Sequence, residues 1–132
     1  MKLRIALAQV NPTVGDLAAN AALVRENFKS AQEAGAHIVV FPEMVLTGYP
    51  VEDLALRPSF QIASQNALAE LAKSLTGKSV AIVGYLDQVD GAPQNMVAVI
   101  SDGVVSARYA KCHLPNYGVF DEFRNFVPGD KT

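Results

Sequence analysis

Two charged side chains, Glu43 and Lys111, each follow a short apolar segment that has the character of a buried strand. A charge at such a position costs stability unless it faces an opposite charge or a cleft. The carboxyl ends of strands are also where α/β enzymes place their chemistry. Beside a nucleophile, a carboxylate can accept a proton and an ammonium can stabilise an oxyanion, as acyl transfer requires. The pair therefore predicts part of a catalytic site, to which Glu122 is a candidate third member.

The elements that must position these groups follow from the spacing of apolar residues. Alternating residues from position 3 predict a first strand, and continuous apolar runs predict later, buried strands. Asp16 is a candidate N-cap and Gly35 a candidate C-terminal stop for a first helix. Strands are expected at 3–9, 38–41, 80–83, 94–100 and 104–111, and helices at 17–34 and 59–75.

The order of these elements is βαβαβ followed by a β-hairpin. Asp102-Gly103 is the tight-turn pair expected between the last two strands. This order predicts a layered α/β fold with a mixed sheet. A long loop, 42–58, separates the second strand from the second helix, and loops of that length in compact domains are often functional.

Composition narrows the function classes. Half of the 132 residues are hydrophobic and 18% are charged, which favours a packed core. The net charge of −2 provides no basic footprint, so a nucleic-acid partner is not expected. No segment is long enough to span a membrane. The single cysteine excludes an internal disulfide framework, and we expect a reducing, cytoplasmic setting.

Two motifs carry a family resemblance. The segment Phe41-Pro42-Glu43 with 46–50 (LTGYP) resembles the glutamate motif of the nitrilase, or carbon–nitrogen hydrolase, superfamily. The segment 111–122 (KCHLPNYGVFDE) is more specific and resembles the lysine motif of the glutaminase domains in glutamine-dependent NAD synthetases. The opening strand, 5–11, and Val14-Gly15-Asp16 also fit, so the resemblance covers the whole chain.

The resemblance implies roles for individual residues. Glu43 would be the general base, Lys111 would stabilise the tetrahedral intermediate, and Glu122 would orient the lysine or the substrate. Tyr49, Tyr117 and Phe120 would line a glutamine pocket. The family's nucleophilic cysteine lies on a strand beyond the lysine motif, outside this chain.

The resemblance also implies an architecture. We expect a nitrilase-type αββα sandwich of which residues 1–132 are the first half. The rest of that domain and a C-terminal synthetase domain would lie outside the chain. That second domain would bind ATP, Mg²⁺ and nicotinic acid adenine dinucleotide, and no cofactor or metal is expected here. A homo-oligomer is expected, and the fragment alone is not expected to be active.

Other interpretations stay open. Cys112 adjoins Lys111, but successive side chains of a strand point to opposite faces, so we expect it to be a packing residue. His113 is expected to be structural rather than a metal ligand. Tyr49 and Tyr117 could equally be core aromatics. The alternatives for the whole chain are a stand-alone amidase or nitrilase, and a catalytically inert structural or interaction module.

Overall fold

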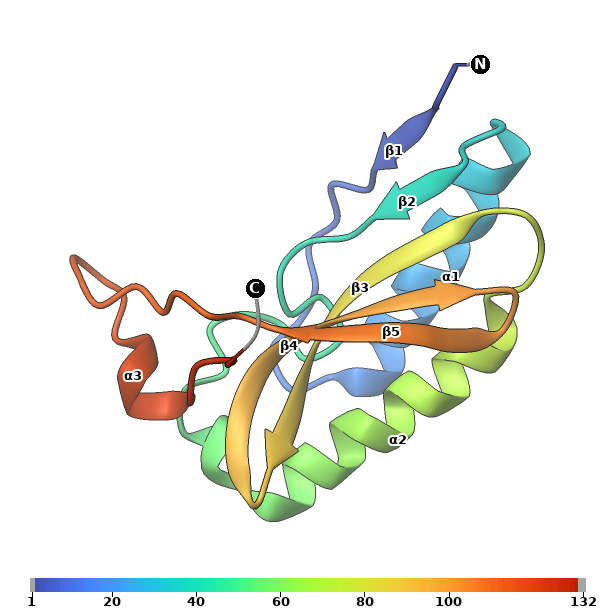
Figure 1. Ribbon diagram of the computed structural model, residues 1–132. Coiled ribbons are helices and arrows are strands. Elements are labelled where there is room, and N and C mark those ends of the chain that lie inside the picture. Colours follow the sequence, from blue (N-terminus) through green and yellow to red (C-terminus); the bar gives the residue numbers. More distant parts are fainter. Residues whose placement is uncertain (1, 131–132) are drawn as a thin grey trace.

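The computed structural model describes residues 2–130 as one five-stranded mixed sheet with two long helices (Figure 1). The strands are β1 (Ile5–Leu7), β2 (Ile38–Val40), β3 (Val80–Val89), β4 (Ala92–Ser101) and β5 (Val104–Ala110). The helices are α1 (Leu17–Glu33), the 3₁₀ helix η1 (Glu52–Leu56), α2 (Pro58–Ser74) and the short α3 (Glu122–Asn125).

The sheet order is β1-β2-β3-β4-β5, so neighbours in sequence are neighbours in the sheet. β1, β2 and β3 run parallel, and β3, β4 and β5 are antiparallel to their neighbours. The predicted βαβαβ order with a following hairpin is therefore confirmed. The two helices that join the parallel strands are the crossover connections that such pairs need.

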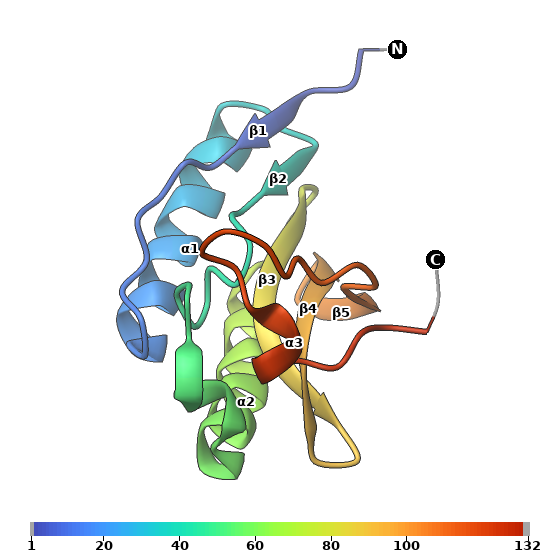
Figure 2. The same ribbon diagram turned by 90° about the vertical axis from the view of Figure 1, so that its left-hand side faces the viewer.

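Helices α1 and α2 lie on the same side of the sheet (Figure 2). Their apolar faces meet the inward residues of β3 and β4 in the main core, which includes Phe28, Leu71 and Ile100. The predicted ends of α1 are confirmed. The Asp16 side chain accepts a hydrogen bond from the Ala19 amide, and Gly35 follows the helix with a left-handed φ of 80°.

β3 is longer than the expected 80–83, and it forms a ten-residue hairpin with β4 across Asp90-Gly91. Gly84, with Asp87 and Gln88 soon after it, makes this stretch look like a strand end in the sequence. In the structure Gly84 lies inside β3. Glycine is required at this position because the backbone of residues 42–44 passes too close to leave room for a Cβ atom.

The pairing of β4 with β5 contains a β-bulge. Val99 pairs with Ala107 and Ile100 pairs with Val105, so Ser106 is an extra residue on β5. The Ser106 hydroxyl donates a hydrogen bond to the Val99 carbonyl, 3.1 Å away. Beyond the bulge, Arg108 pairs with Ala98 of the helix-covered core, so Tyr109 and Lys111 lie on the sheet face opposite α1 and α2.

Segments 42–56 and 114–126 form a second, smaller apolar cluster with β3. Its buried members are Met44, Val51, Ala55, Leu86, Leu114 and Phe126. α3 lies at one end of the sheet, separate from α1 and α2 (Figures 1 and 2). This cluster brings the ends of β2 and β5 and the start of α3 together.

Candidate active site

Glu43, Lys111 and Glu122 meet in one ionic cluster. The Lys111 Nζ atom lies 2.7 Å from Glu43 Oε1 and 2.9 Å from Glu122 Oε2. The exposed fraction falls from 46% for the Glu43 side chain to 29% for Lys111 and 4% for Glu122. One ammonium thus lies between a half-exposed carboxylate and a buried one. The charged groups therefore face each other, as their positions in the sequence predicted.

Glu43 is held by the turn that follows β2. The Phe41 amide donates a hydrogen bond to the Ile82 carbonyl of β3, and the Leu46 amide donates to the Gly84 carbonyl. Residues 42–45 therefore form a turn between these two attachments to β3. A Cβ atom on Gly84 would lie 2.9 Å from the Pro42 carbonyl oxygen. Met44 is fully buried with a left-handed φ of 50°, a strained conformation for its residue type. Close backbone packing therefore fixes the base of the Glu43 side chain.

Lys111 follows directly after β5, and its backbone is bonded on both sides. Its amide donates to the Asn95 carbonyl at 2.9 Å, and its carbonyl accepts from the Gly129 amide at 3.0 Å. The side chain is therefore presented from a fixed backbone, which limits the entropy lost when the ammonium is ordered.

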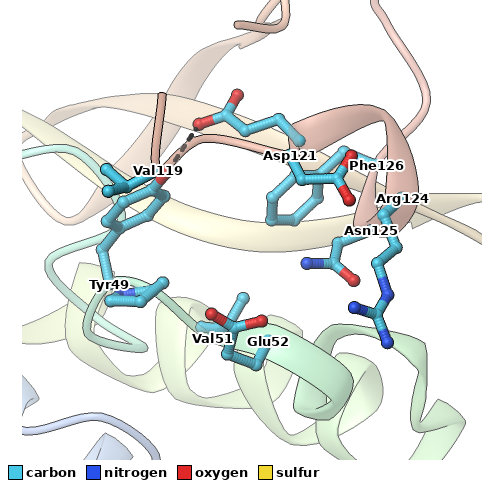
Figure 3. A pocket seen from close by; sticks show the side chains of 10 residues that line it. Tyr49, Val51, Glu52, Val119, Asp121, Arg124, Asn125 and Phe126 are labelled. Atoms are coloured by element: carbon cyan, nitrogen blue, oxygen red, sulfur yellow. Dashed lines mark hydrogen bonds between the residues drawn. The ribbon is translucent and has the colours of Figure 1, made fainter. Parts of the chain in front are cut away.

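Glu122 opens α3, and its carboxylate is oriented by Tyr49. The Tyr49 hydroxyl donates to Glu122 Oε1 at 2.9 Å, the bond shown dashed in Figure 3. Lys111 Nζ also donates to this oxygen, at 3.1 Å. Asp121, the adjacent acid, is exposed. Only one member of this acidic pair enters the cluster, as expected for adjacent residues.

The two acids keep Lys111 protonated. Partial burial by itself lowers the pKa of Lys111, but the hydrogen bonds and charges of Glu43 and Glu122 outweigh it and hold that pKa above its usual value. Burial, with the hydrogen bond to Glu122, raises the pKa of Tyr49. At neutral pH the cluster therefore presents an ammonium and a neutral phenol.

Two hollows border the cluster. One, of about 230 Å³, is lined by both Glu43 and Lys111 and by apolar side chains, among them Phe41, Met96 and Val97. The other, of about 130 Å³, lies beside Tyr49 and Glu122 and carries the charged groups Glu52, Asp121 and Arg124 (Figure 3). Apolar space next to a few convergent polar groups is typical of small-molecule sites.

Three other candidates from the sequence lie outside the ionic cluster. Tyr117 is 71% exposed and packs edge-to-face on Phe120, which is 37% exposed, with ring centroids 5.7 Å apart. Their place in a glutamine pocket stays a prediction. The Cys112 sulfur lies 3.2 Å from the Tyr109 hydroxyl.

Asn95 is a member of the site that the sequence reasoning missed. Its side-chain Nδ2 donates to Glu43 Oε1 at 2.5 Å, and the residue is 5% exposed. In the sequence it is an ordinary residue of a predicted strand. Its position opposite Lys111 could have been found only by locating the bulge in β5.

Neither a metal centre nor a membrane span was found among residues 2–130. No group of three or more His, Cys, Asp and Glu side chains in this range is placed to hold a metal ion. None of the helices described is long and apolar enough to cross a membrane.

Comparison with known proteins places this geometry in a family. The carbon-nitrogen hydrolase family model matches residues 4–132. The glutamine-dependent NAD(+) synthetase of Thermotoga maritima is 42% identical over 131 residues, which is 98% of this chain and 23% of that protein. The Rhodobacter capsulatus enzyme of the same name is 45% identical over 130 residues, with 97% and 23% covered. The chain thus spans about a quarter of the length of these relatives.

Solved structures agree with the sequence match. A glutamine-dependent NAD+ synthetase from Acinetobacter baumannii, in complex with ADP, superposes with a TM-score of 0.90 at 38% identity. The match covers 98% of this chain and 24% of that one. An amidase from Nesterenkonia sp. superposes with a TM-score of 0.77 at 24% identity, which shows the shared fold. The chain therefore belongs to the carbon-nitrogen hydrolase family and has a nitrilase-superfamily fold.

Proposed function

We propose that this chain supplies three catalytic side chains of a glutaminase that releases ammonia for NAD synthesis. The observation that carries the proposal is the Lys111 ammonium held between Glu43 and Glu122. The names of the relatives support glutamine as the substrate. The chain covers about a quarter of those relatives, so the proposed activity is that of a longer protein.

Glu43 is proposed as the general base. It would take the proton of a cysteine thiol that the remainder of the domain provides, and the thiolate would attack the side-chain amide carbon of glutamine. Lys111 would stabilise the resulting oxyanion, which is where a fixed positive charge has the greatest effect on the barrier. Glu122 would keep the ammonium in place.

The C–N bond would then break, and the proton held by Glu43 would pass to the departing nitrogen to give ammonia and a thioester. Water, deprotonated by Glu43, would hydrolyse the thioester to glutamate and restore the thiol. The ammonia would be used in a separate synthetase domain, with ATP and Mg²⁺, to convert nicotinic acid adenine dinucleotide to NAD.

The experiment compares two nitrogen sources in the full-length protein that carries this chain. Glu43→Gln and Lys111→Ala are each expected to abolish glutamine-driven NAD synthesis and to leave ammonia-driven synthesis largely intact. The matched controls are Glu33→Gln and Lys29→Ala, which alter an exposed ion pair on α1 and should change neither rate. Substantial glutamine use by either site variant would contradict the proposal.

The same assay separates the alternatives. A stand-alone amidase would release ammonia from an amide but would make no NAD from either nitrogen source. An inert module would release none, and its variants would behave like the parent.

A further inference from the structure

Asn95 holds Glu43 by one specific oxygen. The Asn95 side-chain Nδ2 and the Lys111 Nζ both donate to Glu43 Oε1, at 2.5 Å and 2.7 Å. The two donors lie side by side, Asn95 on β4 and Lys111 directly after β5, where the Lys111 amide donates a hydrogen bond to the Asn95 carbonyl. Asn95 is nearly fully buried, so its amide is fixed by packing. The Glu43 carboxylate thus accepts hydrogen bonds from a neutral donor, Asn95, and from a cationic donor, Lys111.

The two donors differ in what they are free to do. In the proposed reaction the Lys111 ammonium must also interact with an oxyanion. Its hydrogen bond to Glu43 weakens while that oxyanion is present. The Asn95 amide carries no charge that the oxyanion could attract. It can therefore keep Glu43 in place throughout the reaction, as pre-organisation of a catalytic group requires.

We propose that Asn95 is a positioning residue that fixes Glu43 Oε1 and leaves Oε2 as the oxygen that takes the proton. A proton added to Oε1 would compete with two hydrogen bonds, whereas one added to Oε2 leaves both intact. The inference rests on the proposed function, since it assigns a role in the work of the same base.

The first test is Asn95→Leu in the full-length protein, a change of similar volume that removes the donor. We expect kcat for glutamine-driven synthesis to fall about 10- to 100-fold, the usual effect of removing a group that orients a catalytic one, with KM for glutamine nearly unchanged. Ammonia-driven synthesis should stay the same. The matched control is Gln61→Leu, which removes another buried side-chain amide, bonded to the Ala55 carbonyl. It should lower stability without changing kcat.

The second test is Asn95→Asp, which keeps the shape and polarity but offers no N–H. Ionised, the new carboxylate repels Glu43; protonated, it again offers a donor. We therefore expect the kcat ratio of this variant to the parent to rise as pH falls. A purely structural role would give a kcat ratio independent of pH. This ratio can still be measured if Asn95→Leu fails to fold.

The outcomes separate this inference from the proposed function. Suppose that Glu43→Gln abolishes glutamine use but folded Asn95→Leu keeps kcat within about threefold of the parent. That loss is far smaller than the loss of an orienting group causes, so the proposed role of Asn95 would be wrong. A flat pH ratio for Asn95→Asp also overturns it. If Glu43→Gln itself retains glutamine use, the proposed function fails first.

Discussion

The Lys111 ammonium contacts both oxygens of Glu122, at 2.9 Å from Oε2 and 3.1 Å from Oε1. Among residues 2–130, Oε2 is fully buried and accepts no hydrogen bond of good geometry, so the charge of Lys111 is its main compensation. A buried carboxylate that loses its counter-charge is strongly destabilising. The stability of this end of the sheet therefore depends on Lys111.

Replacing Lys111 with methionine should lower the free energy of unfolding by about 3 kcal/mol, because it leaves Glu122 buried without a cation. The control is Lys73→Met, which breaks an ion pair of similar length, 2.6 Å, on the surface of α2. Exposed pairs contribute only about 0–1 kcal/mol. Urea unfolding at neutral pH measures both, and equal losses would contradict the central place of Lys111.

The Lys111 contribution should also depend on pH. Its pKa is raised above the usual 10.5 by Glu43 and Glu122, so the folded state holds the proton more tightly than the unfolded chain does. The stabilisation is then fully present below pH 10.5 and is lost as pH rises through the raised value. The stability difference between the parent and Lys111→Met should be constant from pH 7 to 9 and shrink above about pH 10.5. A difference that grows with pH would refute this.

Tyr49→Phe should reduce glutamine-driven kcat about tenfold, because it removes one of the donors that hold Glu122 behind Lys111. The loss of stability should be modest, about 1 kcal/mol. Tyr85→Phe is the matched control, since Tyr85 donates to Asp87 in the same way but on the helix-covered face. If the two variants lose the same small fraction of kcat, Tyr49 does not act through the cluster.

Gly84→Ala should displace the turn that carries Glu43. The added methyl group would be 2.9 Å from the Pro42 carbonyl oxygen and 3.0 Å from the Glu43 carbonyl carbon. Overpacking of this kind costs about 1–3 kcal/mol, and the shifted base should lower glutamine-driven kcat more than it lowers stability. Gly91→Ala, in a turn with open space around it, should lose stability only. Crystallography of Gly84→Ala would reveal the displacement directly, and an unmoved Glu43 would contradict the prediction.

The sequence predicted the sheet and the charged cluster because both depend on local signals. Apolar runs identified the strands, and the charged residues after two of them identified the cluster. Gly84 was misleading, because its reason for being glycine lies in a segment 40 residues away in sequence. Asn95 could not be found for a similar reason, since its importance depends on which residue of β5 lies opposite.

The bulge at Ser106 decides which face of the sheet Lys111 occupies. Residues that pair directly across two strands point to the same face, and Lys111 lies opposite Asn95 only because β5 has one extra residue between its pairs with Ile100 and Val99. If β5 paired with β4 without that extra residue, Val99 would pair with Ser106, Ala110 would lie opposite Asn95, and Lys111 would turn toward the helices. Deleting Ser106 is therefore expected to remove the bulge and leave Lys111 in place. Inserting one residue between Ala107 and Ala110 would move Lys111 to the wrong face, although its motif would be unaltered.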